Sequence, residues 1–143
     1  MPAHGSYKIS AVAKAADISI KDLNRNLDRK VIKIPGPAPG KGRPRLSSLA
    51  TIHHIAIGHA LTKLSVAPAA AMAIASKFLE PQRGRELGKP FESGKTLLIV
   101  KANGVGSIIK LEADQDISSH LDTATMVVDI GTIISTVNSR LPR

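Results

Sequence analysis

The 143-residue sequence contains no cysteine, no tryptophan and very few other aromatic residues, namely Tyr7, Phe78 and Phe91. Without cysteine the chain cannot form disulfides, thiolate-based zinc sites or iron–sulfur sites, and it has no thiol nucleophile. The shortage of aromatic side chains argues against binding of unpaired bases, which proteins hold largely by stacking. If the partner is a nucleic acid, duplex DNA is favoured over single strands.

Long hydrophobic runs are also missing. No stretch reaches the roughly 18 consecutive apolar residues of a membrane-spanning helix, and residues 1–10 lack the apolar segment of a secretory signal. Hydrophobic residues still make up 43% of the chain, which is enough for a packed core. We expect a soluble, cytoplasmic protein with no membrane partner, and the absence of cysteine is typical of that reducing compartment.

Excess positive charge lies in one half of the chain. Residues 1–79 contain twelve Lys or Arg and three Asp, a net charge of +9, whereas residues 80–143 contain eight residues of each sign. A basic half joined to a neutral half indicates a nucleic-acid-binding module beside a module with a different role.

The basic half begins with two short amphipathic segments. Residues 8–16 carry apolar side chains at helical spacing, and a tight connection follows at residues 17–19. Ser19 and Asp22, three positions apart, match the capping-box pattern at the start of a second helix. In that helix the spacing predicts a buried stripe formed by Ile20, Leu23, Leu27 and Val31.

The opposite side of the second helix carries hydrogen-bonding side chains. Arg and Lys can bridge guanine in the major groove, Asn can pair with adenine, and Asp can accept from cytosine. Asp28 has an equally good alternative, an ion pair or hydrogen bond with Arg25 or Asn24 along the helix. The candidate base-reading residues are Lys21, Asn24, Arg25 and Asp28.

A short strand is predicted over residues 31–34, and a loop with four prolines and three glycines follows over residues 35–45. Such a loop suits a wing that lies along phosphates or in a minor groove. The candidate residues for contacts with the DNA backbone are Arg29, Lys30, Lys33, Lys41, Arg43 and Arg45.

At this point the sequence resembles a known family. Residues 9–19, Ile-Ser-Ala-Val-Ala-Lys-Ala-Ala-Asp-Ile-Ser, followed by Leu23, by Arg-Lys-Val-Ile at 29–32 and by the basic wing, are similar to the N-terminal winged helix-turn-helix of MerR-type regulators and related phage and excisionase proteins. The resemblance covers about residues 7–80. It implies that Lys21, Asn24, Arg25 and Asp28 occupy recognition-helix positions, that Arg43 and Arg45 lie on the wing, and that a helical pair follows over residues 47–79. The long dimerisation helix and the metal-binding cysteines of the metal-sensing members are missing.

The sequence as a whole predicts an α+β fold with three parts. Residues 1–80 form the winged helix-turn-helix domain with its following helices, and residues 81–95, rich in Pro and Gly, form a linker. Residues 96–143 form a small dimerisation or interaction module. It has a hairpin closed by an Asn-Gly turn at 103–104 and a third strand at 124–128, followed by a helix that Asp129 caps. A single helix over residues 123–141 is the alternative for its end.

No residue pattern predicts an enzyme, a metal site or a cofactor. His53, His54 and His59 do not have the spacing of three or four residues that places two ligands on one helical face, so we expect helix residues that are partly buried. Asp114, Asp116 and His120 fall in a loop between strands, which favours solvated side chains over a catalytic group.

These observations predict a sequence-specific regulator of transcription that binds double-stranded DNA as a homodimer. The second helix enters the major groove and the wing contacts the backbone. One alternative is an excisionase-like architectural factor that bends DNA for a mobile element with an integrase partner. Another is a protein-interaction or ligand-sensing protein with a merely solvated basic face. The sequence does not identify RNA polymerase or any other further partner.

Overall fold

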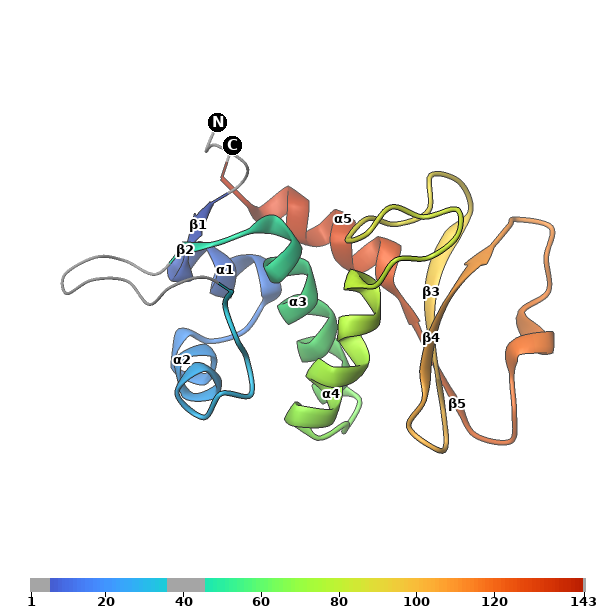
Figure 1. Cartoon of the computed structure of the whole chain (residues 1–143), viewed down its shortest axis with the longest axis horizontal. Coiled ribbons are helices and arrows are strands. Elements are labelled where there is room, and N and C mark those ends of the chain that lie inside the picture. Colours follow the sequence, from blue (N-terminus) through green and yellow to red (C-terminus); the bar gives the residue numbers. More distant parts are fainter. Residues whose placement is uncertain (1–5, 36–45, 143) are drawn as a thin grey trace.

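The computed structural model describes residues 6–35 and 46–142 and has an α+β architecture (Figure 1). Its helices occupy one end and the middle of the long axis, and a three-stranded sheet occupies the other end. The α-helices of the described residues are α1 (Ile9–Ala16), α2 (Ile20–Asp28), α3 (Leu49–Lys63), α4 (Pro68–Ala75) and α5 (Ile130–Arg140), with 3₁₀ turns at Ser76–Leu79 and Ile117–His120.

The larger sheet is antiparallel, with strand order β4-β3-β5. It contains β3 (Lys95–Lys101), β4 (Gly106–Leu111) and β5 (Thr125–Asp129). The predicted hairpin is confirmed, because β3 and β4 pair across the turn, where Gly104 adopts a positive φ of 83°. Only glycine adopts this conformation without steric cost.

The third strand and the final helix also form as predicted. The β-branched run at Val127 and Val128 pairs with β3, and an oxygen of the Asp129 side chain accepts a hydrogen bond from the Thr132 amide at 3.0 Å. The cap begins α5 directly after the strand. The alternative of one helix over residues 123–141 is therefore wrong.

The strand predicted over residues 31–34 does not form. Lys30 adopts a left-handed conformation with φ of 59°, which turns the chain back at the end of α2. The amides of Val31 and Ile32 then donate to the Asn26 carbonyl at 2.9 and 3.1 Å, and these bonds terminate the helix. Instead, β1 (Tyr7–Lys8) pairs antiparallel with β2 (Leu46–Ser47), a two-residue contact that sequence periodicity could not predict.

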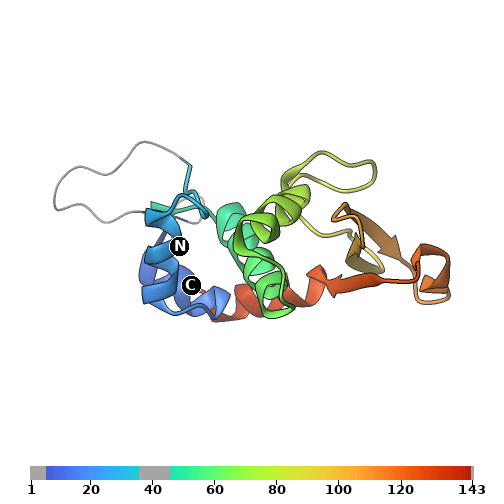
Figure 2. The same cartoon turned by 90° about the horizontal axis from the view of Figure 1, so that it is seen from below.

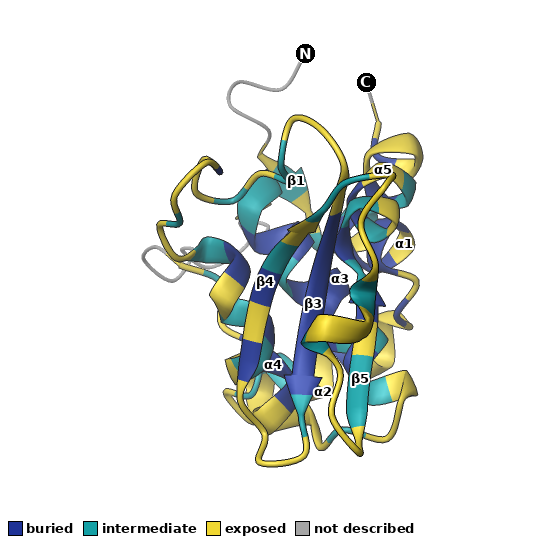
Figure 3. Ribbon diagram, turned by 90° about the vertical axis from the view of Figure 1, so that its right-hand side faces the viewer, coloured by how far each residue is buried: buried dark blue, intermediate teal, exposed yellow. Residues whose placement is uncertain are grey.

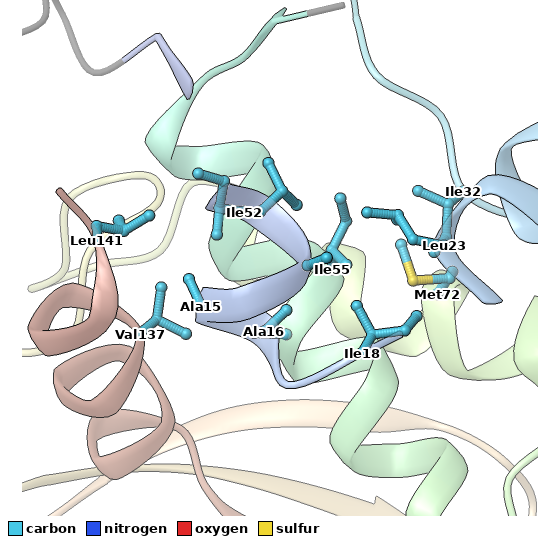
Figure 4. Close-up of a cluster of buried hydrophobic side chains, with 13 residues drawn as sticks. Ala15, Ala16, Ile18, Leu23, Ile32, Ile52, Ile55, Met72, Val137 and Leu141 are labelled. Atoms are coloured by element: carbon cyan, nitrogen blue, oxygen red, sulfur yellow. The ribbon is translucent and has the colours of Figure 1, made fainter. Parts of the chain in front are cut away.

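Two hydrophobic clusters hold these elements together. In the first, shown in Figure 4, side chains of α1 and α3 occupy the middle, Leu23 and Met72 lie at one edge, and Val137 of α5 and Leu141 just after α5 lie at the other. In the second, Phe78 and residues of α3 and α4 pack against the sheet and the start of α5. Residues on both sides of the predicted 81–95 linker contribute to both clusters, so packing is continuous along the molecule.

The outer face of the sheet is covered by the connection from β4 to β5. This connection crosses β3, because β3 lies between the two strands it joins (Figure 3). Leu97 and Ile99, which alternate with the inward side chains of β3, are buried as a result. Lys101 fixes the crossing segment by donating to the His120 carbonyl at 2.6 Å and by pairing with Asp122 at 3.4 Å.

The segment predicted as a linker contains a buried arginine. Arg85, only 7% exposed, lies over the Phe78 ring, with its guanidinium carbon 5.1 Å from the ring centroid. Its guanidinium donates to the backbone carbonyls of Phe78 and Lys89, each at 3.0 Å, and of Glu80 at 3.2 Å. The side chain thus ties the end of the Ser76–Leu79 turn to the loop that follows.

His53 of α3 is buried between the two clusters. One ring nitrogen, Nε2, contacts Oδ1 of Asn138 at 2.9 Å, and the ring meets Phe78 edge to face. The other nitrogen, Nδ1, is buried without a partner among the described residues. Burial lowers the pKa of His53 below its ordinary value of 6.5, because the charged imidazolium would be desolvated there.

This burial predicts acid sensitivity. Below pH 6.5 the unfolded chain takes up a proton on His53 that the folded chain resists, so the free energy of unfolding should fall as the pH decreases. Urea unfolding at pH 7.5 and 5.5 measures the effect. We expect the wild-type protein to lose about 1 kcal/mol more stability across this interval than His53→Gln, whose amide does not titrate. His59, whose pKa is also lowered by burial, remains in both proteins. Equal pH dependence in the two would contradict the assignment.

Candidate nucleic-acid interface

The turn between α1 and α2 is defined by local hydrogen bonds. Asp17 adopts a left-handed conformation with φ of 57°, and the Ile18 amide donates to the Ala13 carbonyl at 3.0 Å. Asp tolerates this conformation better than most side chains. Lys63 of α3 donates to the Asp17 carboxylate at 3.1 Å, and this hydrogen bond is the main cause that lowers the pKa of Asp17. The turn is therefore attached to the helix behind it.

The start of α2 is capped as its sequence predicts. The Ser19 hydroxyl accepts a hydrogen bond from the Asp22 amide at 3.0 Å. The carboxylate of Asp22 also lies in the first turn of the helix, where negative charge is favourable. These features fix both the starting residue and the rotation of α2.

Leu23 anchors α2 to the rest of the protein. Its side chain is completely buried and belongs to the cluster that contains Ile18, Ile32 and Met72 (Figure 4). Leu27 and Val31 are half-buried, as the predicted stripe requires. Ile20 is the exception, because its side chain is 50% exposed. The stripe fails at its first residue, although Ile18, two positions earlier, is buried in the core.

The predicted base-reading residues share the exposed side of α2. Lys21, Asn24, Arg25 and Asp28 are all exposed, and Leu23 faces the opposite direction. Among the described residues the Asp28 side chain makes no ion pair or hydrogen bond with Arg25 or Asn24, so the alternative predicted for Asp28 is wrong. Arg25 pairs instead with Asp22 at 3.4 Å. Both partners are about half-exposed, and a surface pair of this kind contributes at most about 1 kcal/mol. The Arg25 guanidinium can therefore exchange this partner for another acceptor.

The predicted backbone-contacting residues fall into two groups. Arg29, Lys30 and Lys33 are exposed at the end of α2 and just after it. Lys41, Arg43 and Arg45 lie outside the described residues.

Four of the cations at and just after α2 have no carboxylate partner among the described residues, unlike three lysines of the neutral half. The structure pairs Lys89, Lys101 and Lys110 with carboxylates within 4.0 Å. Over residues 6–35 and 46–142, no carboxylate lies within that distance of Lys21, Arg29, Lys30 or Lys33, whereas Arg25 of the same helix pairs with Asp22. Four cations without a carboxylate partner thus lie within residues 21–33, at the α2 end of the molecule (Figure 1).

The flank of α2 borders a cleft of about 250 Å³. Arg29 and Asn26 line one side, and His59, Thr62 and Met72 of α3 and α4 line the other. Burial is the main cause that lowers the pKa of His59, and the nearby Lys63 adds to it. Because of this cleft, one flank of α2 is not packed against another helix.

The histidines of α3 have separate partners, as their spacing predicts. His53 contacts Asn138, whereas Nε2 of His54 contacts the Met72 carbonyl at 2.8 Å. His53 is buried, and His54 and His59 are partly buried. Within the described ranges, no three His, Cys, Asp or Glu side chains are grouped so as to bind a metal ion.

Every helix in the described part of the chain is too short or too polar to cross a bilayer. Comparison with known proteins finds no family model that matches the sequence and no curated protein with significant similarity to it.

Proposed function

We propose that this protein is a sequence-specific regulator that binds duplex DNA as a homodimer through a winged helix-turn-helix formed by α1, α2 and the basic segment that follows. One observation carries the proposal. A capped helix buries one apolar side through Leu23 and presents Lys21, Asn24 and Arg25 to solvent on the other. Such a helix can enter a major groove while the rest of the fold stays outside it.

The exposed side chains match the donors and acceptors of base edges. Arg25 would bridge O6 and N7 of guanine, and Asn24 would bridge N6 and N7 of adenine. Arg29, Lys30 and Lys33 lie beyond these positions along the chain, where uncompensated cations are suited to phosphate contacts. Lys41, Arg43 and Arg45 are proposed for the same role from their sequence alone.

The position of α2 is compatible with a dimer. Viewed from below in Figure 2, α2 and the three-stranded sheet lie at opposite ends, with α3 and α4 between them. A second copy that contacts the sheet end would leave α2 free for DNA. Two recognition helices, one on each of two paired half-sites, increase both affinity and selectivity.

Selection of bound sequences from a random duplex library, followed by affinity measurements on single-base variants, tests base reading. Asn24→Ala and Arg25→Ala should each lose about 1–3 kcal/mol of discrimination at one position of the selected site, because each removes a bidentate contact. Arg83→Ala is a matched control, since Arg83 is an exposed arginine of the neutral half. Unchanged sequence preference in both α2 variants would exclude α2 as the reading helix.

The basic segment should contribute affinity without sequence preference. Arg43→Ala and Arg45→Ala should weaken binding to all duplexes about equally. Each should also reduce the slope of log K against log salt by about 1, because each removes one phosphate contact. Titrations between 50 and 200 mM salt measure this slope. If a variant has the same slope as the wild-type protein, the arginine that it lacks does not contact a phosphate.

A further inference from the structure

Ile20 is the residue that departs most clearly from the predicted pattern of α2. It is the first residue of the helix and directly follows the Ser19 cap. Periodicity assigns it to the buried stripe, but half of its side chain surface is exposed, whereas Leu23 is completely buried. An apolar side chain therefore lies at the exposed N-terminal end of a helix whose other exposed residues are polar.

Exposure alone would not distinguish Ile20, because single exposed apolar residues are normal on protein surfaces. Leu64 and Leu87, for example, are exposed to a similar degree elsewhere in the molecule. The position of Ile20 is what matters. Asn24 follows it by four residues, and residues at this spacing are neighbours on a helix, with Cβ atoms about 5–6 Å apart. Lys21 is exposed in the same turn.

We propose that Ile20 contacts the C5-methyl group of a thymine in the major groove, within two base pairs of the A·T pair that Asn24 contacts. This inference rests on the proposed function of α2 and names a further base that the helix reads. The N-terminal residues of a recognition helix are those that contact base edges in helix-turn-helix proteins. Thymine is the base that presents a methyl group in that groove, and apolar side chains recognise it.

The geometry also determines where this thymine lies relative to the adenine. Base pairs follow one another every 3.4 Å along a strand. A separation of about 5–6 Å between Ile20 and Asn24 therefore spans no more than one or two base-pair steps. The isoleucine side chain has no hydrogen-bond donor or acceptor. It can therefore distinguish bases only by covering the methyl group of thymine and removing it from water. The contact thus selects thymine over cytosine and also over uracil.

Deoxyuridine provides the test, because it differs from thymidine only by this methyl group. Each thymine of the site recovered by selection is replaced singly by deoxyuridine, and the affinity of the wild-type protein is compared with that of Ile20→Ala. One thymine should respond, and it should lie within two base pairs of the position where Asn24→Ala weakens the base preference. Removal of its methyl group should lower the wild-type affinity about fourfold, as expected for one buried methyl-sized group. At the same thymine Ile20→Ala should bind both duplexes equally.

Leu87→Ala is the control, because it removes a comparably exposed apolar side chain from the loop between Ser76–Leu79 and β3. It should retain the wild-type response to deoxyuridine. Thermal unfolding of both variants shows whether each is folded at the temperature of the assay. If no thymine responds to methyl removal, or if Ile20→Ala responds as strongly as the wild-type protein, the inference is wrong. Failure to recover any specific site would instead overturn the proposed function itself.

Discussion

Arg85→Met should lower the free energy of unfolding by about 3 kcal/mol. The substitution keeps an apolar stem over Phe78 but removes the guanidinium that donates to the carbonyls of Phe78, Glu80 and Lys89. The Phe78 carbonyl keeps the Gly88 amide as a donor, but the carbonyls of Glu80 and Lys89 lose their Arg85 donor. Each buried carbonyl without a donor costs about 1–3 kcal/mol, and water will replace some of the lost bonds at the rim. Urea unfolding followed by circular dichroism measures the change.

The control for Arg85→Met is Arg83→Met, two residues earlier and exposed, which should stay within about 0.5 kcal/mol of the wild-type protein. Arg85→Lys separates charge from geometry. An ammonium group keeps the charge but cannot reach carbonyls on several sides as a planar guanidinium does, so this variant should also be destabilised. Hydrogen exchange of the Gly88 amide, which donates to the Phe78 carbonyl at 3.2 Å, reports the local effect. Wild-type stability of Arg85→Met would show that the loop is held by other contacts.

Arg85 also illustrates what sequence could not predict. The Pro and Gly content of residues 81–95 indicates irregular structure, and the segment is indeed irregular. The segment is held in place by the Arg85 side chain, whose partners are mainly backbone carbonyls. Every residue has such a carbonyl. No spacing of residue types reveals which of them an arginine will bind.

Three predictions that depended on local turn and cap chemistry were accurate. The Asn-Gly turn, the Ser19 cap and the Asp129 cap each involve residues within four positions of one another, so the sequence contains all the partners. The α+β class and the exposed side of α2 followed from the same kind of information.

Two predictions failed because they depended on distant packing partners. The apolar run at 31–34 favoured a strand, but the left-handed turn at Lys30 directs Ile32 into the core instead. Ile20 has the periodicity of a buried residue, but burial also requires a neighbouring element, and Ile20 is left half-exposed where Leu23 is completely covered. Periodicity defines the side of a helix, whereas tertiary packing decides how far along that side the core extends.

Among truncations of buried residues, Leu23→Ala should cause the largest loss of DNA affinity for a given loss in the free energy of unfolding. Leu23 is the completely buried residue of α2, and the cleft of about 250 Å³ leaves one flank of the helix without close packing. Truncation of a buried leucine costs about 2–5 kcal/mol. Since few other contacts hold α2, much of this cost should appear as detachment of the helix before the rest of the protein unfolds.

Leu61→Ala provides the comparison. Leu61 of α3 is equally buried but belongs to the cluster that packs against the sheet. It should lower the global unfolding free energy by a similar amount and leave the affinity of the folded protein for its selected DNA site unchanged. Leu23→Ala should lose that affinity at temperatures where circular dichroism still reports most of the native helix. If both variants bind the site equally well while folded, the position of α2 is not what DNA affinity depends on, and the basic segment alone would have to carry it.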